Sequence, residues 1–232
     1  MDAAKPPVNL AVFDFDGTCL AGNSTVMVAR DLARRRLISR SCTLRLIFWG
    51  VRYALHLPRE RGGSFRYIFS AFRGWTARET DAYMAEVYAE TVRPRLRPGA
   101  KDAVRDAREA GCVCVLLSAT FENMVRLARD DLGVDCVLAT GMFKDGEGNY
   151  TGLPDGEMEG RHKVEALSAF ADGRFGEGKW ELTYAYGDHH SDRPLLEAAK
   201  HPFVVTPNTG MKHIVKETGW PVLDWEMDVS KL

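Results

Sequence analysis

The sequence predicts an α/β fold with a doubly wound parallel sheet and an all-helical insert after the first strand. Three observations support this prediction. An apolar run over residues 8–14 ends in two acids, residues 24–93 show helical periodicity without a strand signal, and helices and strands alternate after residue 100. Repeated β–α units fold as a parallel sheet with helices on both faces. We therefore expect a core built from residues 1–20 and 95–232, interrupted by a helical segment at residues 21–94.

Four helices are expected in the insert. Apolar residues at helical spacing place them at residues 26–37, 44–57, 65–72 and 76–92. The second helix is very apolar and carries Arg45, Arg52 and His56 on one side. The fourth opens on Thr76 followed by Glu79, which is the pattern of a capping box.

The alternation after residue 100 defines the rest of the sheet. Helices are expected at residues 100–110, 121–132, 161–170, 194–199 and 211–218, strands at 113–117, 134–139, 182–186, 203–205 and 222–223, and a hairpin over 140–153. Ser118 follows the strand at 113–117, and Gly187 with Asp188 follows the strand at 182–186. As at Asp14, chemically active residues thus stand directly after buried strands.

The bulk composition is that of a soluble globular protein. Apolar residues make up 45% of the 232-residue chain and charged residues 27%, with a net charge of −1. The five cysteines are odd in number and lack the paired spacing of a metal site, and no secretory signal precedes the first strand. We therefore expect reduced thiols and a cytoplasmic location. No apolar run reaches the roughly 18 residues of a membrane span, and no nucleic-acid partner is expected.

Charge is distributed unevenly along the chain. Residues 21–98 hold 15 arginines, no lysine and six acids, a net charge of +9, which leaves −10 for the remainder. The insert and the core therefore present different surfaces. The apolar, Trp-containing helix at 44–57, with arginines on one side, suits peripheral contact with an anionic membrane surface. The favoured interpretation is that this helix forms the insert's own core and that its arginines are solvated or steer anionic substrates.

The polar residues at the strand ends define a chemistry. The carboxyl ends of parallel strands meet at one edge of a sheet, which brings together Asp14, Asp16, Ser118, Lys163, Asp188 and Asp192. Several carboxylates in close proximity repel one another unless a divalent cation lies among them, and oxygen ligands favour Mg²⁺ over zinc. A lysine and a hydroxyl that face such a metal are suited to hold a phosphate, with the loop amides after Asp14 as further donors.

These residues resemble the four motifs of the haloacid dehalogenase superfamily. Asp14-Phe15-Asp16-Gly17-Thr18 resembles motif I, Ser118 motif II, Lys163 motif III, and residues 187–192 motif IV, all in the family's order. The helical insert between motifs I and II resembles the family's type I cap. The similarity covers essentially the whole chain and is greatest to subfamily IB, which includes phosphoserine phosphatase. It implies a Rossmann-like core and a Mg²⁺-dependent phosphatase.

The resemblance also implies a role for each residue. Asp14 is then the nucleophile that forms an aspartyl-phosphate, and Asp16 is the general acid and base. The implied Mg²⁺ ligands are Asp14, the main-chain carbonyl of Asp16, Asp188 and Asp192. The implied phosphate-binding residues are Ser118 and Lys163, together with Phe15 and Ala119.

Several residues also have a structural interpretation. Ser118 is of a type that caps helices, and Ser191-Asp192 precedes a helix that contains Pro194. His189 and His190 are adjacent in a loop, so a position at the edge of a pocket is favoured over joint metal binding.

Gly22 and Pro98 lie where the chain enters and leaves the insert, and we expect them to act as hinges.

The substrate and the reaction leave alternatives open. Residues 19–24, which follow motif I, contain no acid, whereas phosphoserine phosphatases carry a glutamate there that meets the substrate amine. This difference argues against phosphoserine itself, and hydrolysis of another small phosphorylated molecule is favoured. A phosphatidylglycerophosphate-like lipid phosphate is the second interpretation. Phosphoryl transfer to an alcohol and a non-catalytic phosphate-binding role are the others, and the oligomeric state is left open.

Overall fold

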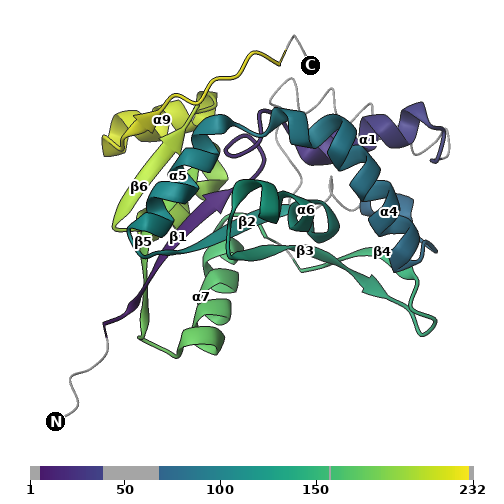
Figure 1. Cartoon of the computed structure of the whole chain (residues 1–232), viewed down its shortest axis with the longest axis horizontal. Helices are drawn as coiled ribbons and strands as arrows, with labels where there is room; N and C mark the ends of the chain where they lie inside the picture. The colour runs from purple at the N-terminus through teal and green to yellow at the C-terminus, as the bar shows by residue number, and fades with distance from the viewer. Residues whose placement is uncertain (1–5, 39–67, 157, 230–232) are drawn as a thin grey trace.

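The computed structural model describes residues 6–38, 68–156 and 158–229. These ranges form a seven-stranded sheet in the order β4-β3-β2-β1-β5-β6-β7 (Figure 1). Its strands are β1 (Val8–Asp14), β2 (Val113–Phe121), β3 (Cys136–Lys144), β4 (Tyr150–Asp155), β5 (Trp180–Gly187), β6 (His201–Val205) and β7 (Val222–Leu223). Neighbouring strands are parallel except β3 and β4, which form the expected antiparallel hairpin. The predicted α/β fold is confirmed.

Helices cover both faces of this sheet. α5 (Pro98–Glu109) and α6 (Glu122–Leu132) pack on one face, and α7 (Arg161–Phe175), α8 (Arg193–Ala198) and α9 (Thr209–Thr218) pack on the other. Successive residues of a strand point to opposite faces. In β1, Ala11 and Phe13 accordingly join the apolar cluster that contains α5 and α6, whereas Leu10 and Val12 join the cluster that contains α7, α8 and α9.

The described part of the insert is helical. It contains α1 (Ser24–Arg34), a 3₁₀ turn (Ser70–Phe72), α4 (Ala77–Val87), a π-helical turn (Tyr88–Val92) and a second 3₁₀ turn (Arg93–Arg95). The capping box of α4 is confirmed, because Glu79 N donates to Thr76 Oγ1 at 3.2 Å and Thr76 N donates to Glu79 Oε2 at 2.8 Å. The helix expected at 44–57, with Arg45, Arg52 and His56, lies outside the described residues, as does the start of the helix expected at 65–72.

The described insert packs tightly against the sheet and α6. Met84 of α4 belongs to the same cluster of buried residues as Phe121 of β2. The insert also pairs with the outer edge of β4, where Gly74 N donates to Tyr150 O and Tyr150 N donates to Trp75 O, both at 2.8 Å. Because an uncovered strand edge invites pairing with other chains, this contact shields one end of the sheet.

Strand β2 is longer than the sequence predicts. It continues through Ser118 to Phe121, and its register against β3 is irregular between these two residues. Ser24 Oγ, from α1, lies 2.8 Å from Thr120 Oγ1 within this extension. α6 consequently begins at Glu122 with Phe121 in the N-cap position, so the interpretation of Ser118 as a helix cap is wrong.

Two further boundaries differ from the expected ones. The strand predicted at 134–139 and the first strand of the hairpin form one continuous strand, β3, and the helix predicted at 161–170 continues to Phe175. Among the described residues, no helix combines the length and apolar character needed to cross a membrane.

Candidate active site

Three neighbouring strands end at the same edge of the sheet. β1 lies between β2 and β5 and ends at Asp14, which is in register with Leu117 of β2. Ser118, the next residue of β2, therefore lies beside this end of β1, and Gly187 ends β5 on the other side. The loop that follows Gly187 carries Asp188 to the same edge. The convergence expected from the sequence is therefore present.

Three carboxylates meet at this edge around one lysine. Asp14, Asp188 and Asp192 each place a carboxylate oxygen within 4.8 Å of the others. Lys163, from the first turn of α7, is 3% exposed, and its Nζ donates to Asp14 Oδ1 at 2.5 Å and to Asp192 Oδ1 at 2.7 Å. One buried lysine that pairs with two of three clustered acids leaves an excess of negative charge when all are ionised.

Thr18 is a contact residue of this cluster that the sequence reasoning left without a role. Its Oγ1 lies 3.0 Å from Asp188 Oδ1 and 3.3 Å from Asp14 Oδ2. The hydroxyl hydrogen can serve only one of these acceptors at a time. Because Thr18 follows Asp14 by a single turn of loop, its presence in motif I was the signal for this contact.

Two glycines permit the acids to approach so closely. Gly17 has φ of 88°, and a Cβ there would overlap the Asp188 carboxylate. A Cβ on Gly187 would lie 2.8 Å from Asp192 Cβ. Any larger residue at either position would push an acid out of the cluster, and at Gly17 it would also strain the backbone.

The carboxylate of Asp16 is bound at the start of α1. Its Oδ1 accepts from Ser24 N at 2.7 Å and its Oδ2 accepts from Ser24 Oγ at 3.1 Å. Ser24 is the first residue of α1, so the carboxylate also meets the positive end of a helix dipole. Ser24 Oγ and Thr25 Oγ1 each lie 2.8 Å from Thr120 Oγ1 of β2. The side chain of Asp16 is thus held apart from that of Asp14, and no pattern in the sequence indicated Ser24 or Thr120.

The environment raises the pKa values of both motif I acids. For Asp14, burial raises the pKa to about 7, with Lys163 opposing this and Asp192 adding to it. For Asp16, burial raises the pKa to about 6 against the lowering effect of the two hydrogen bonds from Ser24. Both groups therefore titrate near neutrality in the metal-free protein.

Burial and neighbouring charges also shift the pKa values of Asp188 and Lys163. Burial, followed by the charges of Asp14 and Asp192, raises the pKa of Asp188 well above its ordinary value. Burial lowers the pKa of Lys163, but Asp14 and Asp192 outweigh it, so the net pKa is raised and the lysine keeps its proton. The repulsion among the acids is what a bound divalent cation relieves.

The residues predicted to bind phosphate flank Asp14. Ser118 is 1% exposed, and its Oγ accepts a hydrogen bond from Thr120 N at 3.2 Å. Phe15 follows Asp14 directly and is fully buried, and Ala119 follows Ser118 within β2. Phe15 and Ala119 therefore lie on the neighbouring chain segments that continue from β1 and from Ser118 of β2.

The loop after Asp188 is a short, capped turn. The rings of His189 and His190 lie 3.9 Å apart, and His189 Nδ1 is 2.8 Å from Ser191 Oγ. In the described chain, neither histidine belongs to the group of potential metal ligands. Asp192 Oδ2 accepts from His189 N at 3.1 Å and so caps this turn rather than α8, which corrects the expectation that Ser191-Asp192 caps the helix containing Pro194.

The expected hinge residues lie at neighbouring chain crossings. Gly22 has φ of 139° and Pro98 is the first residue of α5. The two crossings are tied together, because Ala21 N donates to Arg95 O at 2.9 Å. Their role as hinges stays a prediction.

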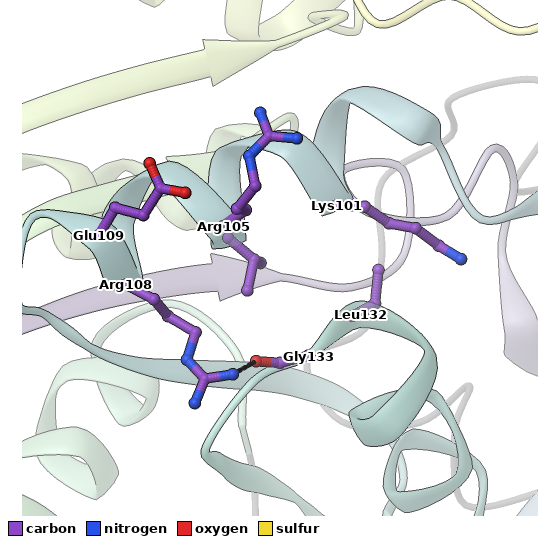
Figure 2. Close-up of a pocket in the computed structure, with 7 residues that line it drawn as sticks. Lys101, Arg105, Arg108, Glu109, Leu132 and Gly133 are labelled. Carbon is purple, nitrogen blue, oxygen red and sulfur yellow. Dashed lines mark hydrogen bonds between the residues drawn. The ribbon is translucent and has the colours of Figure 1, made fainter.

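A separate hollow of about 360 Å³ lies between α5 and the end of α6 (Figure 2). Among its lining residues, Arg108 donates to Gly133 O at 3.0 Å and lies 3.2 Å from Asp135. Arg105 is paired with Asp102 and Asp106 on its own helix. Acids thus pair with both arginines of this hollow.

A family model described as haloacid dehalogenase-like hydrolase matches residues 11–197. This range contains all of the clustered residues: Asp14, Asp16, Thr18, Ser118, Lys163, Asp188 and Asp192. The chain therefore belongs to the haloacid dehalogenase-like hydrolase family.

Several of the relatives carry the names of phosphatases. A Mycobacterium tuberculosis protein that carries the name probable phosphatase is 30% identical over 95% of this chain and 76% of its own length. A phosphoserine phosphatase of the same organism is 27% identical over 96% of this chain and 74% of its own length. A histidinol-phosphatase of Neisseria meningitidis is 24% identical over 94% and 99%. The predicted hydrolase class is confirmed.

Solved structures share the whole architecture. A protein of unknown function from Bordetella pertussis Tohama I is 27% identical, with a TM-score of 0.83 over 95% of this chain and 100% of that one. A phosphoserine phosphatase, solved as a phospho-aspartyl intermediate analogue, has a TM-score of 0.64 at 18% identity, over 98% and 97%. The second likeness shows the fold alone, and it confirms the expected phosphoserine phosphatase-like architecture.

Proposed function

We propose that this protein is a Mg²⁺-dependent phosphomonoesterase that acts through an aspartyl-phosphate on Asp14. One observation carries the proposal. The Asp14 carboxylate is bound to the buried Lys163 and lies within 4.8 Å of the carboxylates of Asp188 and Asp192. A nucleophile beside a fixed cation and a group of metal-binding acids suits phosphoryl transfer, which depends mainly on positioning and charge stabilisation.

The donor set fits magnesium. Asp14, Asp188, Asp192 and the main-chain carbonyl of Asp16 would hold the ion, and all of these donors are oxygen atoms. The three carboxylates outnumber the single buried lysine that pairs with them. When bound, the ion neutralises charge on its ligands and on the phosphoryl group.

The chain's own residues supply the rest of the reaction. An Asp14 oxygen attacks phosphorus, and the bond from phosphorus to the leaving oxygen breaks while Asp16 delivers a proton to that oxygen. Asp16 then takes a proton from the water that attacks phosphorus, which releases inorganic phosphate and restores the Asp14 carboxylate. A pKa of about 6 suits Asp16 to both directions of proton transfer. Lys163 and Ser118 offset and orient the phosphoryl oxygens.

The proposed substrate is a small phosphorylated molecule. Two relatives are named for phosphoserine and for histidinol phosphate, which are both phosphate esters of a primary alcohol. Residues 19–24 carry no acid, so we assign substrate choice to the cap, residues 21–94. Lipid contact stays a prediction, because the helix expected at 44–57 lies outside the described residues. Phosphoryl transfer to an alcohol stays a prediction as well. A cytoplasmic location is part of the proposal and is supported by the four described cysteines, all of which are buried free thiols.

The test is the release of phosphate from an aryl phosphate with and without Mg²⁺. We expect hydrolysis that requires Mg²⁺ and that Asp14→Asn abolishes. Asp102→Asn on the surface of α5 makes the same chemical change away from the site and should keep full activity. Undiminished hydrolysis by Asp14→Asn would remove the assignment, and a preparation inactive on amino-acid, sugar, nucleotide and lipid phosphates alike would favour a non-catalytic role.

A further inference from the structure

Arg97 is a second buried cation near the acid cluster. It precedes α5 and is 7% exposed, and its backbone N donates to Cys19 O at 2.8 Å. Its Nη1 donates to Trp225 O at 2.5 Å, while its Nε is buried without a partner in the described structure. Burial lowers the pKa of Arg97, and the charge that most opposes this effect is that of Asp188. The guanidinium is therefore bonded to the C-terminal residues and interacts electrostatically with Asp188.

Trp225 is held in place by its indole ring. A Cβ on Gly99 would lie 2.5 Å from Trp225 Cδ1, so the ring rests directly on the backbone of α5. The ring also stacks on Tyr186 with centroids 5.9 Å apart, and Tyr186 stacks on Phe13 at 4.4 Å. Phe13 precedes Asp14 in β1. Trp225 thus packs onto the sheet face that leads into the site. We call the C-terminal residues 222–229, which begin with β7, the strap.

The carbonyl and the N–H of Trp225 are each connected to Asp188 through a chain of contacts. Its carbonyl accepts from Arg97, whose backbone holds the carbonyl of Cys19, and the neighbouring Thr18 hydroxyl lies 3.0 Å from Asp188 Oδ1. Its N–H donates to Thr206 Oγ1 at 3.3 Å. Thr206 lies directly before the Pro207-Asn208 turn, and Asn208 N donates to Asp188 O at 3.3 Å. The strap therefore reaches the side chain and the main chain of Asp188 along two separate routes.

The route through Thr206 contains strained backbone. Thr206 has φ of 39°, which is uncommon for a residue that is not glycine. Such a conformation persists only where the surroundings enforce it, and here Thr206 N donates to Leu223 O at 2.9 Å at the start of the strap. Contacts on both sides of Thr206 come from residues 223–225.

We infer that Trp225 and Arg97 are positioning residues that hold Asp188 for metal binding, so that the C-terminal strap sets the Mg²⁺ affinity of the site. The inference rests on the proposed function, because it assigns Asp188 to the metal. Residues that orient a metal ligand without touching the metal typically contribute about 10- to 100-fold to affinity.

The experiment measures Mg²⁺ affinity by titration calorimetry in the substrate-free protein. Trp225→Ala keeps both peptide groups but loses the ring that anchors them, and it should weaken Mg²⁺ binding at least about tenfold. Trp225→Phe retains an aromatic ring and should restore most of the affinity. At saturating Mg²⁺, the KM for an aryl phosphate should stay near the wild-type value. Trp220→Ala is the matched control, because Trp220 packs in the apolar cluster on the opposite sheet face.

A purely structural role for Trp225 would lower the melting temperature and leave the Mg²⁺ affinity of the folded protein unchanged, and that result would overturn the inference. If Trp225→Ala does not fold, Arg97→Lys keeps the positive charge but removes the guanidinium that donates to the Trp225 carbonyl, and it should weaken Mg²⁺ binding as well. Wild-type protein that neither binds Mg²⁺ nor hydrolyses phosphate esters would contradict the proposed function itself. If the wild-type protein binds Mg²⁺ and hydrolyses phosphate esters, and the Trp225 and Arg97 variants bind Mg²⁺ with unchanged affinity, only the inference about the strap is contradicted.

Discussion

The two acids of motif I are separated by their partners. Asp14 is tied to Lys163 within the acid cluster, whereas Asp16 is tied to the first residue of α1 through both carboxylate oxygens. Two acids that are neighbours in sequence can therefore take different tasks, because one is fixed beside a cation and the other is held at a helix start.

Ser24 controls the proton affinity of Asp16. Its hydrogen bonds stabilise the charged carboxylate and hold down a pKa that burial raises to about 6. Ser24→Ala removes one of these bonds, so the pKa of Asp16 should rise further. Because the leaving oxygen needs the protonated acid, the alkaline limb of kcat/KM should move to higher pH, and kcat should fall roughly tenfold for the loss of one bond to a charged group.

The measurement is the pH dependence of kcat/KM for both proteins. Thr25→Val is a useful control, because the described bond of the Thr25 hydroxyl is to Thr120 and not to Asp16. A Ser24→Ala profile that superimposes on the wild-type profile would show that Asp16 does not govern that limb.

In the absence of metal, we expect the ionised carboxylate of Asp188 to lower the free energy of unfolding. Its pKa is raised above the value in the unfolded chain, so near neutral pH the native protein binds more protons, and its stability increases as pH falls toward the ordinary range of an aspartate. Asp188→Asn removes the buried charge. It should raise the melting temperature in EDTA at neutral pH by about 2–4 °C, the shift expected for roughly 1 kcal/mol in a chain of this size.

Thermal unfolding in EDTA and in Mg²⁺ tests this expectation. Mg²⁺ should raise the melting temperature of the wild-type protein through preferential binding to the native state, and it should have little effect on Asp188→Asn. A variant that melts lower than the wild type in EDTA would mean that Asp188 is not destabilising.

At the scale of elements, the sequence predicted the ends of helices and strands correctly where contacts within a few residues determine them. The start of α4 followed from Thr76 and Glu79 alone, because a capping box is made within one turn. The end of β2 did not, because the extension to Phe121 meets Ser24, a residue almost a hundred positions earlier in the chain. Contacts of that kind leave no mark in a local window of sequence.

The same division applies to the site. The positions of Asp14, Ser118, Lys163 and Asp188 were predictable, because strand ends and motif spacing are local features. The partners that orient them were not. Ser24 serves Asp16 across a loop and a helix start, and its link to Thr120 joins two elements that the fold alone brings together.

The capping box at the N-terminus of α4 offers a test at the scale of one element. Thr76→Ala removes the hydroxyl that accepts from Glu79 N, and it should lower the free energy of unfolding by about 1 kcal/mol. Since Thr76 is remote from the acid cluster in the hydrogen-bond network, the rate of phosphate release per folded molecule should not change. Urea unfolding measures the stability, and a hydrolysis assay measures the rate. An unaltered unfolding midpoint would contradict the structural role of the capping box.

At the scale of the whole molecule, the described insert and the core are joined by more than the two chain crossings. Tyr88 Oη donates to Asp131 at 2.6 Å and Asn123 donates to Asp81 at 2.6 Å, so α4 and the turn after it are bound to α6. Figure 1 shows α4 lying over this side of the sheet, close to α6. Movement at Gly22 and Pro98 would have to break these contacts. In this structure the described helices of the insert are therefore bound to the core through α6.

The account's central claim is that Asp14 carries the phosphoryl group during turnover. The most direct measurement quenches the enzyme in acid during hydrolysis of a phosphate ester with Mg²⁺, reduces it with borohydride, and sequences the motif I peptide by mass spectrometry. Borohydride converts an aspartyl-phosphate into homoserine, so we predict homoserine at position 14, aspartate at position 16, and no conversion when substrate or Mg²⁺ is omitted. Active protein with unmodified Asp14, or with homoserine at another position, would contradict the claim.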